Sequence, residues 1–377
     1  MSGATIVRLA NFVGPRSGGL RTALREWGTG YRSAGHRPVL VVPGPRYDDT
    51  ETAQGRVVTV PGPVVPGTGG YRLIVNRPRL RRLLDALAPD RLEVSDRTTL
   101  RWTGEWARAH GVPSVMVSHE RLGALLHQHL RSRWLSRPVA DRLNAATLAG
   151  YDRVVCTTDW AAAEFRRLGP GPALVPLGVD LDLFHPSRYD ARLRESLARP
   201  GELLVVQCTR LSPEKRADRG IDAVAALRAR GVPAVGVLAG DGPLRARLER
   251  RAAGLPVRLL GFVADRARLA ALLATADVVV APGPVETFGL AALEALASGT
   301  PVVAAADGAL PEVVGGAGVV VRGDGDRYAD GILQVAALPR ADRRRAARMR
   351  AERFGWPASV AGMLAVHGLA SRVREVA

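Results

Sequence analysis

Lysine is almost absent from this 377-residue chain. Of its 53 lysine and arginine residues only Lys215 is a lysine, and with 36 acidic residues the formal net charge is +17. The chain also holds 41 glycines and 26 prolines, so we interpret much of the arginine excess as a bias of the whole composition, of the kind associated with GC-rich coding. The charge still permits attraction to anionic surfaces, either nucleic acid or anionic lipid.

Cysteine and long apolar runs are also scarce. Cys156 and Cys208 are too few for a disulfide framework or a four-ligand zinc site, and we expect two buried thiols in a reducing cytosol. No run of about 18 apolar residues could span a bilayer, and Thr5–Ala10 is too short for the apolar region of a signal peptide. With 47% apolar and 24% charged residues, the composition indicates a globular protein, soluble or peripheral, and excludes a disordered one.

Short apolar segments alternate with amphipathic ones along the chain. Ile6–Ala10 and Leu203–Cys208 are typical of strands, whereas Leu20–Ala34 and Ala217–Arg230 are typical of helices. This alternation predicts an α/β fold of parallel sheets with helices on both faces. A proline-rich stretch at 170–200 interrupts the pattern. We therefore expect two doubly wound, Rossmann-like domains facing across a cleft, with the boundary at residues 182 and 183.

Two cations follow the first strand of the second domain. Arg210 and Lys215 lie just past Leu203–Cys208, at the strand end where ligands of parallel sheets bind. Such a pair suits a diphosphate, because arginine can bind it through two N–H groups while lysine supplies a compact charge. The alternative is two ordinary surface cations. A lone lysine in an arginine-rich chain favours the ligand site.

Two glutamates follow a later strand, Val278–Ala281. Glu286 lies in a Gly/Pro loop and Glu294 two turns inside the helix that we expect after it, with Thr287 as the cap and Gly299 and Pro301 at the end. The helix N-terminus favours an anion, and Glu286 can accept hydrogen bonds from sugar hydroxyls. Glu294 is surrounded by apolar neighbours in the sequence and needs a partner, such as a ribose diol.

The first domain offers weaker candidates. The glycine-rich stretch 14–20 lies between a predicted strand and a helix and could approach an anion, although it matches neither a phosphate-binding P-loop nor a dinucleotide fingerprint and could equally be a tight turn. His119 follows the strand Val115–Ser118 and could bind a hydroxyl or relay a proton. The sequence shows no metal-ligand constellation.

Taken together, these motifs resemble the retaining glycosyltransferases of family 4, which have the GT-B fold. The resemblance rests on Gly18-Gly19, His119, Gly178–Asp180, Arg210 with Lys215, Gly240–Leu244, Gly261–Val263 and the spacing of Glu286 and Glu294. Segments 11–22, 92–97, 117–122 and 281–293 are most similar to actinobacterial phosphatidylinositol mannoside mannosyltransferases. Those enzymes use GDP-mannose and form an α-1,6 bond to a phosphatidylinositol dimannoside.

The resemblance implies a role for each matching position. His119, Arg210, Lys215 and Glu286 would be catalytic. Gly18 and Gly19 would lie near the donor diphosphate, and Arg210 and Lys215 would bind it. Glu294 would bind the ribose, and Gly261, Phe262 and Val263 would line the base pocket. The transferred sugar would be held by Glu286 and by the backbone N–H groups of Phe288, Gly289 and Leu290. His119 would contact the sugar from the acceptor domain. A last helix, about 357–376, would return to the first domain, giving domains 1–182 plus 356–377 and 183–355. No metal would be needed, because the cations and the helix dipole would stabilise the leaving GDP. No cofactor would be needed either, since GDP-mannose is a substrate.

The arginine excess is locally dense in the first domain. Residues 71–142 carry 14 basic and 7 acidic groups. The segment holds Arg72, Arg77, Arg79, Arg81 and Arg82, then Arg131, Arg133 and Arg137 beside Leu130, Trp134 and Leu135. This is either a solvated face or a surface that lies on anionic lipid. We expect a cytoplasmic protein, peripheral at the inner face of the cell membrane, with an anionic glycolipid acceptor.

Two alternatives stay open at this point. The donor could be a UDP-sugar or another nucleotide sugar, with a different lipid or a soluble acceptor. The protein could instead bind nucleic acid through its charge, but the sequence contains no recognised nucleic-acid module, and that function leaves Glu286 and Glu294 unexplained. We therefore expect no nucleic-acid partner.

Overall fold

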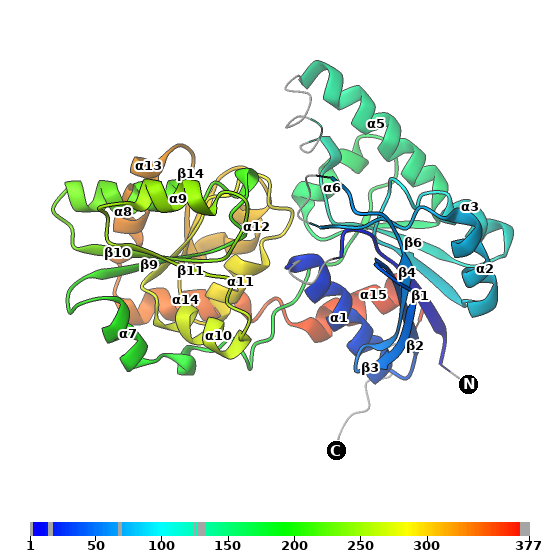
Figure 1. Cartoon of the computed structure of the whole chain (residues 1–377), viewed down its shortest axis with the longest axis horizontal. Coiled ribbons are helices and arrows are strands. Elements are labelled where there is room, and N and C mark those ends of the chain that lie inside the picture. Colours follow the sequence, from blue (N-terminus) through cyan, green and yellow to red (C-terminus); the bar gives the residue numbers. More distant parts are fainter. Residues whose placement is uncertain (1–2, 14–17, 67–69, 124–125, 127–132, 370–377) are drawn as a thin grey trace. The chain divides into compact units, whose positions relative to one another are not determined.

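The computed structural model describes residues 3–13, 18–66, 70–123, 126 and 133–369. The chain forms two compact units, of which the first comprises Met1–Gly178 with Trp356–Ala377 and the second comprises Val179–Gly355. The first stretch of chain thus ends at Gly178, four residues before the expected boundary at 182. Each unit contains a sheet with helices on both faces (Figure 1), and each is described by itself.

The first unit is built on an eight-stranded sheet in the order β3-β4-β2-β1-β5-β6-β7-β8. Its strands are β1 (Thr5–Leu9), β2 (Arg37–Gly44), β3 (Asp48–Thr52), β4 (Gly55–Pro61), β5 (Arg91–Val94), β6 (Ser114–Ser118), β7 (Arg153–Cys156) and β8 (Ala173–Leu174). All neighbours are parallel except β3 and β4, which form an antiparallel hairpin. Because β1 pairs with both β2 and β5, the strand order reverses there, and this is where a doubly wound sheet opens a crevice at its carboxyl ends.

Helices cover both faces of this first sheet. They are α1 (Gly19–Ser33), α2 (Arg77–Leu87), α3 (Thr103–Ala109), α5 (Arg133–Gly150), α6 (Asp159–Arg166) and α15 (Trp356–Val366). One core packs α2, α3 and α6 against the strands, with Leu80, Trp106 and Phe165 buried in it. On the opposite face α1 packs beside α15, so the end of the chain completes the unit that its beginning started.

The docking of α15 is specific. Trp27 Nε1 on α1 donates to Ser359 Oγ at 3.0 Å, and Arg91 Nε donates to the carbonyl oxygen of His367 at 2.8 Å. A Cβ on Gly30 would lie 2.3 Å from a methyl of Val360, so the two helices approach closely only because residue 30 is glycine. The helix ends at Val366, ten residues before the expected end at 376, and Gly368 then adopts a left-handed conformation. Residues 370–377 lie outside the described residues.

The second unit contains a fully parallel six-stranded sheet in the order β11-β10-β9-β12-β13-β14. The strands are β9 (Leu203–Cys208), β10 (Ala234–Ala239), β11 (Val257–Gly261), β12 (Val278–Ala281), β13 (Val302–Ala305) and β14 (Gly318–Val321). The apolar runs of the inner strands β9, β10, β12 and β13 are largely buried, as expected when helices cover both faces, whereas the edge strands β11 and β14 are partly exposed. The strand order reverses between β9 and β12, which pair directly.

The helices of the second unit lie on both faces of its sheet (Figure 1). They are α7 (Ala191–Leu197), α8 (Asp218–Ala229), α9 (Arg245–Ala252), α10 (Arg266–Thr275), α11 (Leu290–Ala297), α12 (Leu310–Val314), α13 (Gly325–Ala336) and α14 (Arg340–Ala351). In Figure 1, α8, α9 and α13 are above the sheet and α10, α11 and α14 below it. The core between α8, α13 and the sheet buries Val224, Val280 and Ile332.

Candidate active site

The loops after β9 and β12 meet at the reversal point of the second sheet. Lys215 ends a short 3₁₀ turn, Pro213–Lys215, in the first loop, and Glu286 lies in the second. The Lys215 Nζ atom is 2.6 Å from Glu286 Oε1, and both side chains are about a fifth exposed. The structure thus brings together the cation predicted for a diphosphate and the carboxylate predicted for a sugar.

Arg210 lies in the same loop as Lys215 but has other partners. Its Nη2 atom is 2.8 Å from Glu214 Oε1, and its Nε donates to Ser212 Oγ at 3.2 Å. Burial alone would raise the pKa of Glu214, yet hydrogen bonds from Ser212 and Arg210 outweigh it and hold that pKa below its ordinary value. Glu214 therefore stays ionised and holds the Arg210 side chain, a partner that the sequence analysis did not identify.

Two glycines let this loop pack against the turn after β10. Gly240 has a φ of +151°, and a Cβ there would lie 1.8 Å from the carbonyl oxygen of Thr209. A Cβ on Gly242 would lie 2.5 Å from the carbonyl oxygen of Leu211. Because the backbones touch, the base of the Arg210–Lys215 loop is fixed by the sheet.

The helix after β12 begins later than expected. Thr287 is not at its N-cap position; α11 begins at Leu290, and Gly289 precedes it with a φ of +94°. The left-handed turn at Gly289 redirects the chain, which delays the helix by two residues and gives the cap position to a glycine. Glu294 is consequently the fifth helical residue, about one turn inside α11 instead of two. Gly299, with a φ of +74°, follows the end of the helix as expected.

The backbone at Glu286 is held from outside its own loop. Ala309 N, just before α12, donates to the Glu286 carbonyl oxygen at 2.8 Å. A Cβ on Gly308 would lie 3.1 Å from that same oxygen, so the two segments are in close contact. The position of the Glu286 carboxylate therefore depends on α12 as well as on its own loop.

Glu294 contacts an arginine that sequence reasoning missed. Arg266, the first residue of α10, places Nη2 at 3.3 Å from Glu294 Oε1, and Glu294 is only 12% exposed. The Arg266 guanidinium also lies 5.1 Å from the ring centre of the buried Phe184. Nothing in the local sequence marks Arg266, since its neighbour relation to α11 arises only from the sheet order.

The remaining predicted donor residues lie at the end of β11 or at the turn into α11. Gly261 ends β11 with a φ of +75°, and the Phe262 side chain that follows is 53% exposed, beside the half-buried Val263. Phe288 is 3% exposed and packs edge to face on Phe354, at 6.0 Å between ring centres. Its side chain is thus part of the core, so only its backbone N–H remains a candidate ligand.

In the first unit, His119 lies directly after β6. Its Nε2 atom is 3.1 Å from Ser95 Oγ, in the loop after β5, and its ring is 5.9 Å from that of Trp27. Burial lowers the pKa of His119 to about 4, with a further contribution from Arg8 and Arg97 that Glu93 opposes. The imidazole is therefore neutral at pH 7, which suits hydrogen bonding to a hydroxyl.

The glycine-rich stretch can be described only in part. Residues 14–17 lie outside the described residues, whereas Gly18 precedes α1 and Gly19 begins it. A Cβ on Gly18 would meet no described atom within 4 Å, so packing of the described part of the unit does not require glycine there. The roles predicted for Gly18 and Gly19 stay predictions.

Both thiols are poor nucleophiles. Cys156 is buried and Cys208 is half-buried at the end of β9, and neither forms a disulfide. Burial raises the pKa of each thiol to about 12, with the nearby Glu294 carboxylate adding to the effect at Cys208. Across the described ranges, no three or more His, Cys, Asp or Glu side chains come together in a way that could hold a metal ion.

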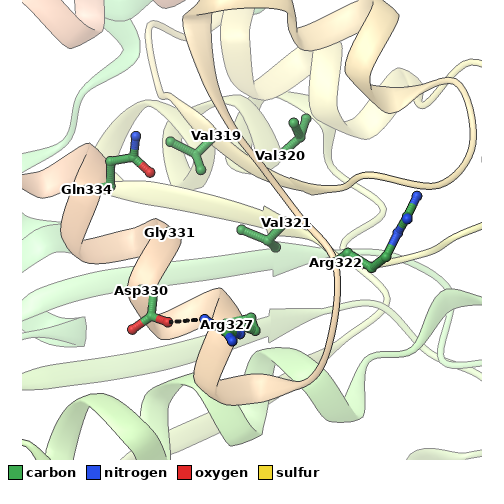
Figure 2. A pocket seen from close by; sticks show the side chains of 8 residues that line it. All are labelled: Val319, Val320, Val321, Arg322, Arg327, Asp330, Gly331 and Gln334. Carbon is green, nitrogen blue, oxygen red and sulfur yellow. Dashed lines mark ion pairs between the residues drawn. The ribbon is translucent and has the colours of Figure 1, made fainter.

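A cavity of about 410 Å³ lies elsewhere, at the edge strand β14 (Figure 2). Its lining comes from β14 and α13 and includes Val319, Arg322, Gly331 and Gln334, and Arg327 pairs with Asp330 at its rim. One strand, β13, lies between β14 and β12 in the sheet order, and none of the predicted site residues lines the cavity. It is therefore not the site formed by the β9 and β12 loops.

The basic surface of the first unit is partly visible. Arg77, Arg79, Arg81 and Arg82 on α2 are exposed, and none forms an ion pair with a described carboxylate. Arg131 lies outside the described residues, as do the side chains of Arg133, Trp134 and Leu135. None of the helices in the described part of the chain has the length and apolar character needed to cross a membrane.

Sequence comparisons match both units to known families. Residues 18–179 match the glycosyl transferase 4-like domain, and residues 202–337 match the glycosyl transferases group 1. A GDP-mannose-dependent alpha-(1-6)-phosphatidylinositol dimannoside mannosyltransferase of Mycobacterium tuberculosis is 50% identical over 366 residues, which cover 96% of each chain. A GDP-mannose-dependent alpha-mannosyltransferase of Mycolicibacterium smegmatis is 30% identical over 298 residues, 72% of each chain.

Comparison with solved structures gives the same fold at low identity. The sucrose-phosphate synthase of Thermosynechococcus elongatus superposes with a TM-score of 0.76 at 22% identity, covering 97% of this chain and 98% of the other. Anabaena HepE, solved with UDP and glucose, gives a TM-score of 0.74 at 21% identity, covering 96% and 98%. With two Rossmann-like units, these family matches and this close relative, the chain belongs to the group 1 glycosyl transferases and is a glycosyltransferase of the GT-B fold.

Proposed function

We propose that this protein transfers mannose from GDP-mannose to a phosphatidylinositol mannoside glycolipid, with retention of the anomeric configuration. The identity of 50% over 96% of both chains to the mycobacterial dimannoside mannosyltransferase supports the donor and the acceptor. The observation that carries the chemistry is the contact of 2.6 Å between Lys215 and Glu286 at the reversal point of the second sheet. The contact supports the proposal because the cation that would bind the diphosphate and the carboxylate that would bind the sugar are neighbours.

The donor would be held by the loops described above. Arg210 and Lys215 would bind the diphosphate, Glu294 the ribose, and Gly261, Phe262 and Val263 the base. Glu286 and the backbone N–H groups of Phe288, Gly289 and Leu290 would hold the mannose, because an α-helix leaves its first N–H groups without intrahelical partners. Gly18 and Gly19 would approach the diphosphate from the first unit, which would bind the acceptor.

The reaction would exchange one C–O bond for another at mannose C1. The bond from C1 to the β-phosphate oxygen breaks, and the acceptor hydroxyl oxygen forms the new α-1,6 bond from the same face. The hydroxyl proton would pass to the departing GDP. Arg210, Lys215 and the N-terminus of α11 would stabilise the negative charge that develops on GDP, and preorganised donors of this kind typically contribute factors of about 10²–10³ each. His119 would hold a sugar hydroxyl as a neutral imidazole. We propose no cofactor or metal.

The place of action would be the inner face of the cell membrane, with the protein bound peripherally through its basic first unit. The exposed arginines of α2 and the exposed Val75 before it form a surface that suits anionic lipid. We propose no nucleic-acid partner.

A donor screen with purified protein tests the proposal. GDP-mannose, GDP-glucose, UDP-glucose and UDP-N-acetylglucosamine would be compared for nucleotide release, with and without phosphatidylinositol dimannoside in detergent micelles. We expect GDP release from GDP-mannose that the acceptor accelerates. Turnover of a UDP-sugar without turnover of GDP-mannose would overturn the donor assignment. Unchanged GDP release with acceptor would overturn the acceptor assignment.

A further inference from the structure

A buried ion pair in the first unit has no part in the donor chemistry. Arg97, in the loop after β5, is 7% exposed, and Glu164 on α6 is 1% exposed. Arg97 Nη1 donates to Glu164 Oε1 at 3.0 Å and to Asn144 Oδ1 of α5 at 2.9 Å. The pair thus joins three elements at the carboxyl end of the sheet.

Both members of the pair also bind the backbone of one loop. Glu164 accepts from Leu122 N through Oε1 at 3.0 Å and from Gly123 N through Oε2 at 3.2 Å. Arg97 Nη2 donates to the carbonyl oxygen of Glu120. Burial of two charges is costly unless geometry and additional hydrogen bonds compensate. Here these additional bonds go to residues 120–123, directly after β6.

This loop carries two basic side chains directly after β6. His119 begins it, with its ring bonded to Ser95 Oγ. The Arg121 guanidinium lies 4.5 Å from the ring centre of Trp160, and burial lowers the Arg121 pKa. Since ligands of doubly wound sheets bind beyond the carboxyl ends of the strands, the backbone path of this loop sets where both side chains are offered.

We propose that Arg97 and Glu164 are a positioning pair for the acceptor, which fix the loop 119–123 so that His119 and Arg121 meet the hydroxyl-bearing anionic glycolipid. Neither residue touches substrate. The inference rests on the proposed function. It assigns positioning of the acceptor to the first unit and most of the donor contacts to the second unit. Loss of the pair should weaken use of the acceptor far more than binding of GDP-mannose, most of whose proposed contacts come from the second unit.

A double substitution distinguishes the positioning role of the pair from a purely structural one. Removing only Glu164 leaves Arg97 buried and uncompensated, so the single variant could fail to fold. Arg97→Met with Glu164→Gln removes both charges and roughly keeps the volume, a replacement that is often neutral for stability. It also removes the donor to Glu120 and weakens the bonds to Leu122 and Gly123. If the pair only stabilises the fold, the double variant should regain both stability and activity relative to the variant that lacks only Glu164.

The control is the Asp152 carboxylate, which contacts the start of β6, at the opposite end of that strand from the loop 119–123. Asp152 accepts from Ser114 N at 2.7 Å and from Ser114 Oγ at 2.9 Å, at the start of β6. Asp152→Asn should lower stability slightly and leave the KM of the acceptor unchanged. Unfolding temperature, GDP release from GDP-mannose without acceptor, and transfer kinetics with phosphatidylinositol dimannoside in micelles would be measured for all variants, with amide hydrogen exchange by mass spectrometry.

For the double variant we expect a near-native unfolding temperature, a KM for the acceptor raised at least tenfold and a much smaller rise in the KM for GDP-mannose. Peptides that contain Leu122 and Gly123 should exchange faster, while β6 stays protected. An acceptor KM equal to that of the wild type, or an equal rise in both KM values, would overturn the positioning role. Absence of GDP-mannose turnover in the wild type would instead refute the proposed function, and the inference with it.

Discussion

The ammonium of Lys215 forms an ion pair with Glu286 in this structure. A diphosphate that binds Lys215 must share or replace the contact with Glu286. The compact charge of lysine suits this role, because three N–H donors on one atom can serve a carboxylate and a phosphate at once. The chain's single lysine therefore lies where a small, rotatable cation is useful.

Replacing Lys215 by methionine should lower the rate of GDP release by about 10²–10³-fold, as expected when one preorganised donor to a developing charge is lost. The control is Arg345→Ala, because Arg345 is 73% exposed and its one ion pair within the described part of the chain is with Asp342, three residues away. Steady-state kinetics with GDP-mannose measure both variants. Equal and mild losses would refute the diphosphate role of Lys215.

His119 predicts a pH dependence with a definite sign. The unfolded chain has an ordinary histidine pKa near 6.5, while the folded chain holds that of His119 at about 4. Protonation therefore favours unfolding, and stability should decrease as the pH falls from about 6.5 to about 4 and not change further below that. The free energy of unfolding, measured by urea denaturation across this window, should vary less with pH in His119→Asn. Parallel pH curves for the two proteins would contradict this.

At Arg348 on α14 the arginine fork reaches acceptors in several directions. Its Nη1 lies 3.0 Å from the carbonyl oxygens of Leu181, Phe184 and Ala297, and its Nε donates to Glu352 Oε1 at 2.9 Å. Arg348→Lys keeps the charge, but a single nitrogen cannot serve both the carbonyl oxygens and the Glu352 carboxylate. We expect a loss of about 1–3 kcal/mol in unfolding free energy, measured by denaturation of the full chain. Arg345→Lys, at an exposed position of the same helix, should change nothing measurable.

Among the elements, the turn into α11 is under a steric constraint that a single substitution can test. A Cβ on Gly289 would lie 2.4 Å from Leu310 Cδ2, and its φ of +94° strains any side chain. Gly289→Ala should therefore destabilise the protein by about 1–3 kcal/mol and raise the KM for the donor, since α11 would shift. Gly316→Ala is the matched control, because a Cβ there meets no described atom within 4 Å. Equal unfolding temperatures for the two variants would refute the constraint.

Helices and strands can be predicted from the sequence where apolar and polar residues form a clear pattern, and they are missed where there is none. The apolar runs of β9 and β12 and the residues just past them were sufficient to predict that Lys215 and Glu286 share one sheet edge. The all-polar strand Asp48–Thr52 has no such pattern and was missed, because it forms only as the edge of a hairpin. Thr287 was wrongly expected to cap α11, since a threonine before an apolar run looks like a cap whether or not a glycine turns the chain after it.

The partners of the site residues were harder to predict than the residues themselves. Arg266 reaches Glu294 from a helix 28 positions earlier, and Glu164 reaches Leu122 from 42 positions later. Such contacts depend on which helices the strand order makes neighbours, a property of the whole sheet. Local sequence contains no signal for them.

For the molecule as a whole, the basic surface predicts salt-sensitive membrane binding. The exposed arginines of α2 would each contribute about 1 kcal/mol near an anionic surface at low salt. Replacing Arg77, Arg79, Arg81 and Arg82 by glutamine should reduce co-sedimentation with phosphatidylinositol vesicles at least tenfold, and added salt should weaken the wild type as well. The control with the same charge change replaces the exposed Arg192, Arg322, Arg327 and Arg345 of the second unit. Equal losses in the two variants would show that only net charge matters.

The discontinuous first unit has a consequence for synthesis on the ribosome. The second unit is one continuous stretch, Val179–Gly355, and can fold as soon as it has left the exit tunnel. The first unit must wait for α15, because Trp27 on α1 finds Ser359 only after nearly the whole chain has been made. The half that would bind GDP-mannose is thus completed before the half that would meet the membrane. A nascent chain truncated by early termination would therefore lack the finished lipid-facing half.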